Sequence, residues 1–186
     1  MPETSFWSQD VCRDLLIDLS WDDDRSSRDF GCAKVVDKDK ERDFALMMIA
    51  PIASAGDPRP AVINLTTLDA VRDTSVVVIH HPLYMQKQIT RDCNVANWKV
   101  PGWVLQTPGI DFSHDCDTEG GSSGAPVFNS AGQLIGLHHY GHAINPDTCA
   151  ETDKVNKAVR LDSIVKFLED NKDANGHIVD KLTIIR

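Results

Sequence analysis

The stretch Asp117–Phe128, DTEGGSSGAPVF, carries the clearest signal in the sequence. Its three glycines permit a tight loop that presents a serine hydroxyl while backbone N–H groups converge on one point. Converging N–H groups of this kind are what the stabilisation of a developing oxyanion requires. The residues Phe128–Leu134, FNSAGQL, follow directly and join two apolar runs in the manner of a hairpin. The sequence therefore predicts a serine-bearing loop held between β-strands.

Two serines of this loop are candidates for a nucleophile. With Ser122 in that role the motif is G-x-S-x-G, the elbow of α/β hydrolases, which has to open into a helix. Pro126 and the strand-like residues after it argue against a helix at this point. Ser123, in G-x-S-G-A-P, is therefore the favoured nucleophile. A cysteine nucleophile is disfavoured because the loop contains no cysteine.

The rest of the chain has the rhythm of an all-β protein. Short segments rich in Val, Ile, Leu and Phe are separated by Gly, Pro, Asn and Asp about every dozen residues, which predicts many short strands in a barrel or sandwich. The expected strands are Cys12–Leu19, Phe30–Val36, Asp43–Ile49, Ser75–His80, Lys87–Cys93, Trp103–Gln106, Ala125–Asn129 and Gln133–His138.

One helix is expected near the C-terminus. Ile164, Phe167 and Leu168 follow the i, i+3, i+4 spacing of an apolar helix face. Asp162 or Ser163 is suited to cap the first turn. A β domain with one terminal helix is therefore predicted.

Composition bounds the class of protein. The 186 residues are enough for one folded domain, and 41% hydrophobic with 25% charged residues is a globular composition. Nineteen Lys and Arg against 28 Asp and Glu give a net charge of −9, which disfavours binding to nucleic acid or an anionic membrane. The longest apolar run, Phe44–Ala50, is far shorter than the roughly 18 residues that span a bilayer. The first residues, MPETSFWSQD, do not have the pattern of a signal peptide.

Four segments together resemble the chymotrypsin-like and trypsin-like serine peptidases. GSSGAP at Gly121–Pro126 is similar to the nucleophile loop of that family, and ERDFALMMI at Glu41–Ile49 to the strand that bears the catalytic aspartate. GQLIGLHHYG at Gly132–Gly141 is similar to the strand that lines the primary specificity pocket, and NKAVRLDSIVKFL at Asn156–Leu168 to the closing strand and helix. Among the members, bacterial glutamyl endopeptidases are the most similar.

The resemblance implies an all-β fold, the chymotrypsin-like double β-barrel, with an incomplete first barrel and a C-terminal helix. Residues 1–172 would form the peptidase domain, with the first barrel reaching to about residue 60, the second spanning about residues 61–155 and the helix about residues 162–172. Residues 173–186 would form a C-terminal tail, whose apolar LTII is suited to a further strand.

The family pattern assigns roles to individual residues. Ser123 is the expected nucleophile, Asp43 the residue that orients the general base, and the N–H groups of Gly121 and Ser123 the oxyanion hole. The family order is histidine, aspartate, serine, with about 45 residues before the aspartate and about 90 after it. Here the second spacing is 123 − 43 = 80. No histidine occurs in the first 79 residues, so we expect a chain truncated before its general base and therefore poorly active as it stands.

Three further histidines and Ser122 lie near the motif or in sequence positions that bear on its role. His80 and His81 end the strand-like VVVIHH, and His114 precedes Ser123 by 123 − 114 = 9 positions. The family pattern places none of these histidines beside the nucleophile. Ser122 stands where trypsin has an aspartate that receives the new N-terminus, so activation by that ion pair is not expected.

His138 and Thr118 indicate which substrate side chain would be accepted. His138 follows Ser123 by 138 − 123 = 15 positions, where glutamate-specific members of the family carry a histidine, and Thr118 matches a hydroxyl residue of the same pocket. A hydrogen bond from imidazole favours a carboxylate over a neutral side chain. The resemblance implies cleavage after acidic residues, above all Glu, and pairing of an extended substrate with the backbone from His139 to Gly141. A hydrogen-bonded core histidine is the other interpretation of His138.

Five cysteines are an odd number, so at least one has no disulfide partner within the chain. Cys93 and Cys116 flank one hairpin-sized excursion, and Cys12 and Cys32 flank another. We predict both pairs as disulfides, which implies an oxidising compartment. Cys149 is then left as a free thiol.

A metal site is disfavoured although His138, His139, His142 and Cys149 lie close in sequence. On a strand, His138 and His139 point to opposite faces, so these side chains would not converge. The acidic run Asp22–Asp24 lacks the glycine and the spaced ligands of a calcium loop.

The sequence thus predicts a serine endopeptidase that forms an acyl-enzyme on Ser123. It would need no cofactor and would act as a monomer on protein or peptide substrates, with neither nucleic acid nor membrane as a partner. A secreted or extracytoplasmic location is expected from the family and the cysteine content. The alternative is a catalytically inactive, protease-like module that only binds an extended peptide.

Overall fold

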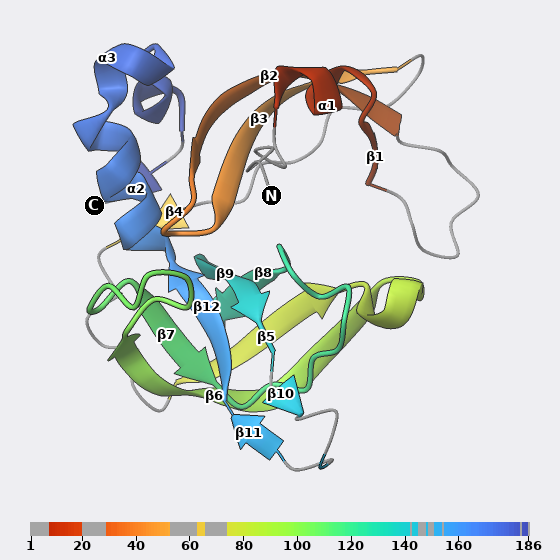
Figure 1. The fold of residues 1–186 in the computed structure, drawn as a ribbon, viewed down its shortest axis with the longest axis vertical. Helices are drawn as coiled ribbons and strands as arrows, with labels where there is room; N and C mark the ends of the chain where they lie inside the picture. Colours follow the sequence, from red (N-terminus) through yellow and green to blue (C-terminus); the bar gives the residue numbers. More distant parts are fainter. Residues whose placement is uncertain are drawn as a thin grey trace.

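Two β units and a C-terminal helical segment make up the protein (Figure 1). The computed structural model describes residues 8–19, 29–52, 63–65, 74–141, 143–144, 148, 151–153, 155–182 and 184–185. A three-stranded sheet comes first in the chain, and a closed barrel follows it. The predicted all-β class with a C-terminal helix is confirmed.

The first unit is an antiparallel sheet in the order β1-β2-β3, preceded by a short helix. Its elements are α1 (Gln9–Arg13), β1 (Leu16–Asp18), β2 (Asp29–Asp39) and β3 (Phe44–Pro51). The prediction of one strand from Cys12 to Leu19 was wrong in its first half. Ser8 caps a helical turn there, because its side chain accepts a hydrogen bond from the N–H of Val11 at 3.2 Å.

The second unit is a six-stranded barrel that closes on itself. Its strands run in the order β12-β7-β6-β5-β8-β9, and β12 also pairs with β9. They are β5 (Ser75–His80), β6 (Gln88–Val100), β7 (Asp111–His114), β8 (Pro126–Asn129), β9 (Leu134–Tyr140) and β12 (Asn156–Arg160).

Gly136 permits the closure of the barrel. A Cβ atom at this position would lie 2.5 Å from Cε1 of Phe112 and 2.5 Å from the carbonyl oxygen of Val159. Both distances are far inside van der Waals contact, so a larger residue would push β9 away from β12 and from the core.

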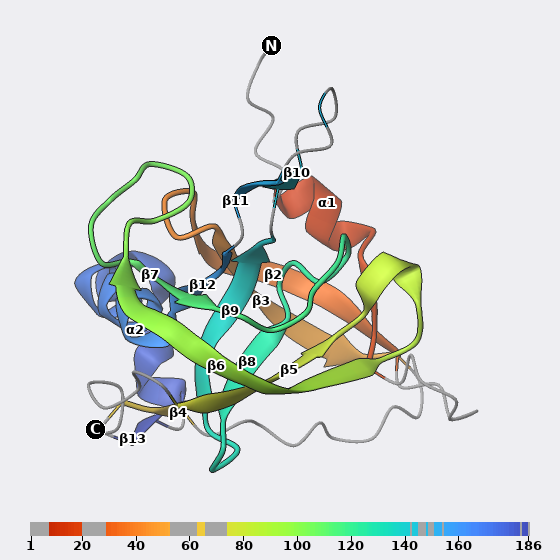
Figure 2. The ribbon, with the colours of Figure 1, turned by 90° about the horizontal axis from the view of Figure 1, so that it is seen from below.

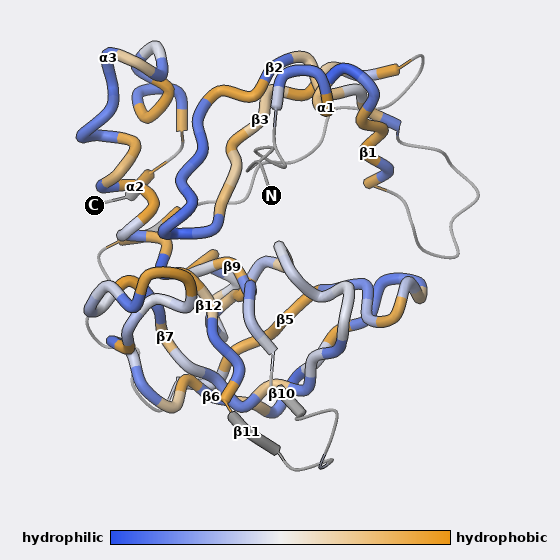
Figure 3. Tube along the Cα trace, viewed as in Figure 1, coloured by the Kyte–Doolittle hydropathy of each residue, from blue (hydrophilic) through white to orange (hydrophobic). Residues whose placement is uncertain are grey.

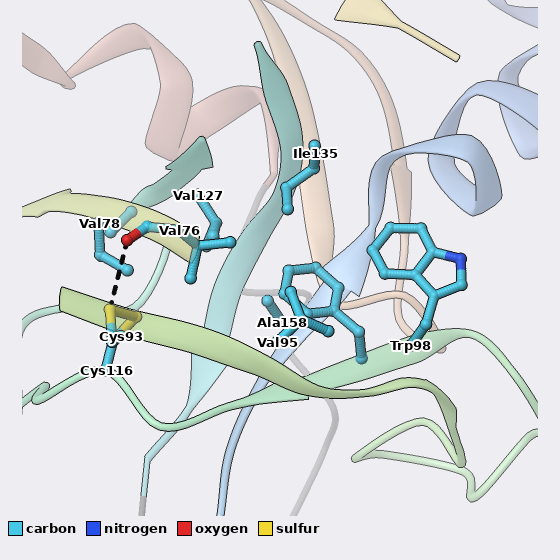
Figure 4. Packing of buried hydrophobic residues seen from close by; sticks show 11 residues of the cluster. Val76, Val78, Cys93, Val95, Trp98, Cys116, Val127, Ile135 and Ala158 are labelled. Atoms are coloured by element: carbon cyan, nitrogen blue, oxygen red, sulfur yellow. Dashed lines mark hydrogen bonds between the residues drawn. A yellow bond between two sulfur atoms is a disulfide. The ribbon is translucent and has the colours of Figure 1, made fainter. Parts of the chain in front are cut away.

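The core of the barrel is apolar and contains one disulfide (Figure 4). Trp98 and Phe112 stack with ring centroids 5.1 Å apart. In Figure 3, β5 is coloured hydrophobic along most of its length, while β6 alternates and buries only one side. The buried cluster comprises Val76, Val78, Cys93, Val95, Trp98, Phe112, Cys116, Ala125, Val127, Ile135 and Ala158.

Both predicted disulfides are confirmed. Cys12 and Cys32 join α1 to β2, and Cys93 and Cys116 join β6 to the segment after β7. Cys149, His142 and the run Asp22–Asp24 lie outside the described residues.

A helical segment connects the two β units. Phe44 of β3 contacts Phe167 of the helix edge-on at 5.6 Å, and Ile164 and Leu168 are buried in the same cluster as Val159 of the barrel. Figure 2 shows this helix, α2, beside β12. The remaining elements are β4 (Ile63–Asn64), η2 (Pro82–Tyr84), β10 (Ala143–Ile144), β11 (Glu151–Asp153), α2 (Leu161–Asp170), α3 (Lys172–Asn175), η3 (Ile178–Lys181) and β13 (Ile184–Ile185), the last pairing in parallel with β4.

Two further local predictions were wrong. Residues Trp103–Gln106 form a turn and not a strand, because Gly102 and Thr107 close it with a backbone hydrogen bond of 2.8 Å. The strand lies just after this turn, at β7. Neither predicted residue is the N-cap of α2: the helix begins at Leu161, and its cap residue, Arg160, makes no capping hydrogen bond with its side chain. Oδ1 of Asp162 instead accepts a hydrogen bond from the N–H of Ser163 within the first turn, at 2.9 Å.

Candidate active site

The loop that carries Ser123 is anchored to β9 by its backbone. The N–H of Gly124 donates to the carbonyl of His138 at 2.7 Å, and the N–H of His138 donates to the carbonyl of Ala125 at 2.8 Å. Gly121 and Gly124 have φ values of +98° and +87°, which glycine adopts without the steric cost of a Cβ. This backbone leaves Ser123 exposed and Ser122 buried.

Two backbone donors of this loop are available to a ligand. The N–H of Ser122 is used within the loop, since it donates to the carbonyl of Glu119 at 3.0 Å. Within the described residues, the N–H groups of Gly121 and Ser123 donate to no protein acceptor. The two amides predicted as oxyanion donors thus flank the buried Ser122 with their hydrogens unused.

Asp43 comes from the other β unit and is positioned by its two neighbours. Asp43 has a left-handed backbone (φ 49°) just before β3, a conformation that aspartate tolerates better than most residues. Nε of Arg42 donates to the carbonyl and to Oγ of Ser163 in α2, at 3.1 and 3.0 Å. Phe44 packs on the same helix. Docking of α2 therefore holds Asp43 against the barrel.

His139 is the barrel residue that Asp43 meets. Nδ1 of His139 lies 3.6 Å from Oδ2 of Asp43, and its Nε2 lies 2.9 Å from Oδ2 of the fully buried Asp111. Burial lowers the pKa of His139, but the hydrogen bond to Asp111 and the charge of Asp43 outweigh that effect and raise the pKa overall. Asp111 thus stabilises the charged form of His139 through a hydrogen bond, and Asp43 does so through a longer contact at Nδ1. The side chain of His139 thus faces the interior, and only its backbone could meet a substrate.

His138 points to a different partner, His114 on β7. The N–H of Cys116 donates to Nδ1 of His114 at 3.3 Å, so the proton of neutral His114 is on Nε2. That Nε2 lies 3.1 Å from Nδ1 of His138 and donates to it. The proton of neutral His138 must then be on Nε2, where it can be donated to a ligand.

Both histidines are neutral at pH 7. Burial lowers the pKa of His114 to about 4. Burial, followed by the neighbouring imidazoles of His114, His139 and His80, lowers the pKa of His138 to about 3. The pair can donate a hydrogen bond without carrying a permanent charge.

Thr118 and Gly141 lie together near the end of β9. A Cβ on Gly141 would lie 3.8 Å from Oγ1 of Thr118. This hydroxyl is buried and has no hydrogen-bond partner among the described residues. A buried hydroxyl without a partner is costly, and it would be satisfied by a polar ligand group.

His80, His81 and His177 have other partners, and His177 lies 3.6 Å from carboxylate oxygens of both Asp173 and Asp180. His80 contacts Ser122, with Nδ1 2.7 Å from Oγ, and His81 contacts the carbonyl of Met85 at 3.1 Å. No histidine hydrogen-bonds Ser123 in the described part of the chain. Sequence reasoning missed three partners, His80, His114 and Asp111, which are all distant in sequence from the residues they bind.

Comparison with known proteins gives a consistent assignment. A family profile described as "Trypsin-like peptidase domain" matches residues 22–137. Glutamyl endopeptidase of Staphylococcus epidermidis is 37% identical over 75 residues, which is 40% of this chain and 23% of that protein. The match thus spans less than a quarter of the relative.

Solved structures share the fold at low sequence identity. A protease of M. tuberculosis in its active form superposes with a TM-score of 0.55 and 20% identity, covering 76% of this chain and 58% of that one. The HtrA-type protease AlgW with a decapeptide gives a TM-score of 0.57 and 16% identity, covering 87% and 44%. Among the helices of the described residues, none has the length and apolar character that crossing a bilayer demands.

Proposed function

Since the chain belongs to the trypsin-like peptidase family, we propose that it is a serine endopeptidase with Ser123 as its nucleophile. The observation that carries the proposal is the exposed Ser123 on a loop whose flanking amides are unused. Asp43 reaches the same strand, β9, through His139. The Ser123 loop contacts β9 at His138 and Asp43 contacts it at His139, which supports a shared site for the two groups.

In the proposed reaction, Oγ of Ser123 attacks the carbonyl carbon of the scissile peptide bond while a general base takes its proton. The N–H groups of Gly121 and Ser123 would stabilise the oxygen that becomes negative. The base returns the proton to the leaving amine, and water then releases the acyl group from Ser123 by the same steps. Asp43 would orient the imidazole base.

The base itself is assigned to no residue of this chain. The family order places it ahead of Asp43, and these 186 residues contain no histidine there. We therefore assign Ser123, Asp43 and the loop amides to this chain, and imidazole supplies the base in the tests below.

We further propose that the residue before the cut is acidic, above all Glu. Nε2–H of His138 and the unpartnered hydroxyl of Thr118 are two donors suited to a carboxylate. The backbone from His139 to Gly141 would pair with the extended substrate, as an added strand. The similar S. epidermidis protein is named a glutamyl endopeptidase. Two disulfides further support an oxidising, extracytoplasmic location.

Peptidyl boronic acids that differ only in their last residue test this proposal. Boron accepts the Ser123 oxygen and forms a tetrahedral adduct that boron NMR detects. We expect the Glu analogue to bind more tightly than its Gln, Lys and Phe counterparts, and Ser123→Ala to form no adduct. Tighter binding of Lys or Phe would reject the acidic preference. Peptide binding that Ser123→Ala leaves intact, with no adduct in either protein, would indicate the peptide-binding module instead.

A further inference from the structure

The side chain of Ser122, next to the proposed nucleophile, is held by a histidine from another strand. His80 is the last residue of β5, and its Nδ1 lies 2.7 Å from Oγ of Ser122. His80 and Ser122 are only 5% and 1% exposed, so water does not compete for this bond. Ser122 lies in sequence between Gly121 and Ser123, whose amides are the proposed oxyanion donors.

The network around His80 assigns every proton. The hydroxyl of Thr90 donates to the carbonyl of Asp117 at 3.0 Å, so it accepts from Nε2–H of His80, also at 3.0 Å. Nδ1 of neutral His80 is therefore unprotonated and accepts from the hydroxyl of Ser122. The oxygen of Ser122 in turn accepts from the N–H of Glu119 at 3.2 Å.

The turn after His80 supports the same loop from its other side. The N–H of Leu83 donates to the carbonyl of Gly120 at 2.7 Å. A Cβ on Gly121 would lie 2.8 Å from the carbonyl oxygen of His81, so the two backbones are as close as glycine permits. Figures 1 and 2 both show the yellow-green turn after β5 beside the green loop before β8.

We propose that His80 is a positioning residue, which holds the loop Gly120–Gly124 in the conformation that presents the Gly121 and Ser123 amides to an oxyanion. This inference rests on the proposed function for the role of those amides. At the position that corresponds to Ser122 of this chain, trypsin has an aspartate, which binds the new N-terminus. In this chain the residue at that position, Ser122, is held instead by a hydrogen bond to His80, which involves no chain terminus.

Nδ1 of His80 can accept the hydrogen bond from Ser122 only while His80 is neutral, and the surroundings of His80 favour its neutral form. Burial, followed by the charge of His81, lowers the pKa of His80. His138 on β9 is a second imidazole that interacts electrostatically with His80. The carboxylate-bearing residues Asp117 and Glu119 contact the network only through backbone atoms.

Three variants test the proposal. Ser122→Ala removes the hydroxyl, and His80→Gln places its amide near the position of Nε2, which retains a partner for Thr90 but leaves Ser122 without one. His80→Asn is the matched control, because its Oδ1 lies near the position of Nδ1 and can accept from Ser122. Thermal melting establishes that each variant is folded. If His80→Gln does not fold, Ser122→Ala, the smaller change, still decides the question.

The measurement is amide hydrogen exchange of the peptide that spans residues 118–124. We expect exchange to be roughly 10- to 100-fold faster in Ser122→Ala and His80→Gln, and close to wild type in His80→Asn. Long-range ¹H–¹⁵N NMR should find the proton of His80 on Nε2. Unchanged exchange in Ser122→Ala, or a proton on Nδ1, would overturn the proposal. Neither readout needs catalysis, so a wild-type chain that forms no boronic acid adduct would reject the peptidase proposal separately.

Discussion

His114 and His138 face each other between β7 and β9, with Nε2 of His114 3.1 Å from Nδ1 of His138. The N–H of Cys116 fixes the tautomer of His114, and His114 fixes that of His138. Nε2–H of His138, the group proposed to bind a substrate carboxylate, is therefore oriented by His114 and the N–H of Cys116, which are not proposed to contact the substrate.

Acid should destabilise the protein through this pair. In the unfolded chain these histidines take up protons near pH 6.5, whereas the folded pKa values are about 4 and about 3. Below pH 6.5 the unfolded state therefore binds more protons than the folded state. The free energy of unfolding then falls by roughly 1 kcal/mol for each histidine with each unit that the pH is lowered. The free energy of unfolding, measured in urea at pH 5 and at pH 7, should differ less between the two pH values in His114→Phe than in the wild type. The exposed His177→Gln is the control, and an unaltered difference in His114→Phe would contradict the prediction.

Replacing Asp111 should have the opposite pH dependence. The raised pKa of His139 contributes stability that is complete below pH 6.5 and is lost as the pH rises through the folded pKa. Asp111→Asn removes one partner of this buried pair, which costs about 3 kcal/mol when the histidine is charged. The loss should be larger at pH 6 than at pH 9, as measured by urea unfolding. The control, Asp117→Asn at an exposed position, should lose little unfolding free energy. Equal losses of unfolding free energy in Asp111→Asn at both pH values would argue against a charged His139.

The hydroxyl of Thr118 should discriminate between Glu and Gln. Thr118→Val keeps the shape of the side chain and removes the donor to a carboxylate. We expect the affinity for the Glu boronic acid to fall about tenfold, because a hydrogen bond to a charged group is lost, and that for the Gln analogue to fall less. The Gln compound thus serves as the control within one variant. Equal losses for both compounds would remove Thr118 from the specificity site.

The cysteines make a separate prediction about stability. Replacing Cys93 and Cys116 together by serine should lower the free energy of unfolding by about 3 kcal/mol, because the unfolded chain loses a cross-link. Mass spectrometry after alkylation without reductant should find one free thiol among the five cysteines. Cys149→Ser should remove that thiol. Two or more free thiols in the wild type would contradict the pairing.

The features that could be predicted from the sequence are those set by short, local stretches of residues. The loop Gly121–Pro126 indicated a tight turn between strands, and the structure places it between β7 and β8. The disulfide pairs followed from which cysteines flank each excursion. Residues Trp103–Gln106 were misassigned because their apolar side chains suggest a strand, while flanking Pro-Gly pairs allow the backbone to close a turn.

The buried partners of the site could not be predicted from one sequence. His80 and Ser122 are 42 positions apart, His139 and Asp111 are 28, and His114 and His138 are 24. Such pairs depend on strand order and register, which local periodicity does not specify. His80 is the last residue of β5, and nothing in the sequence around it indicated its partner Ser122. Asp111 is the first residue of a strand that the apolar pattern did not reveal.

The most direct test of the account is to map the residue that a fluorophosphonate modifies. The chain is incubated with the reagent, with and without added imidazole as general base, and the modified peptide is identified by mass spectrometry. We expect modification at Ser123 that imidazole accelerates, none in Ser123→Ala, and none at Ser122 in the wild type. Modification at another serine, or an unmodified Ser123 at any imidazole concentration, would contradict it.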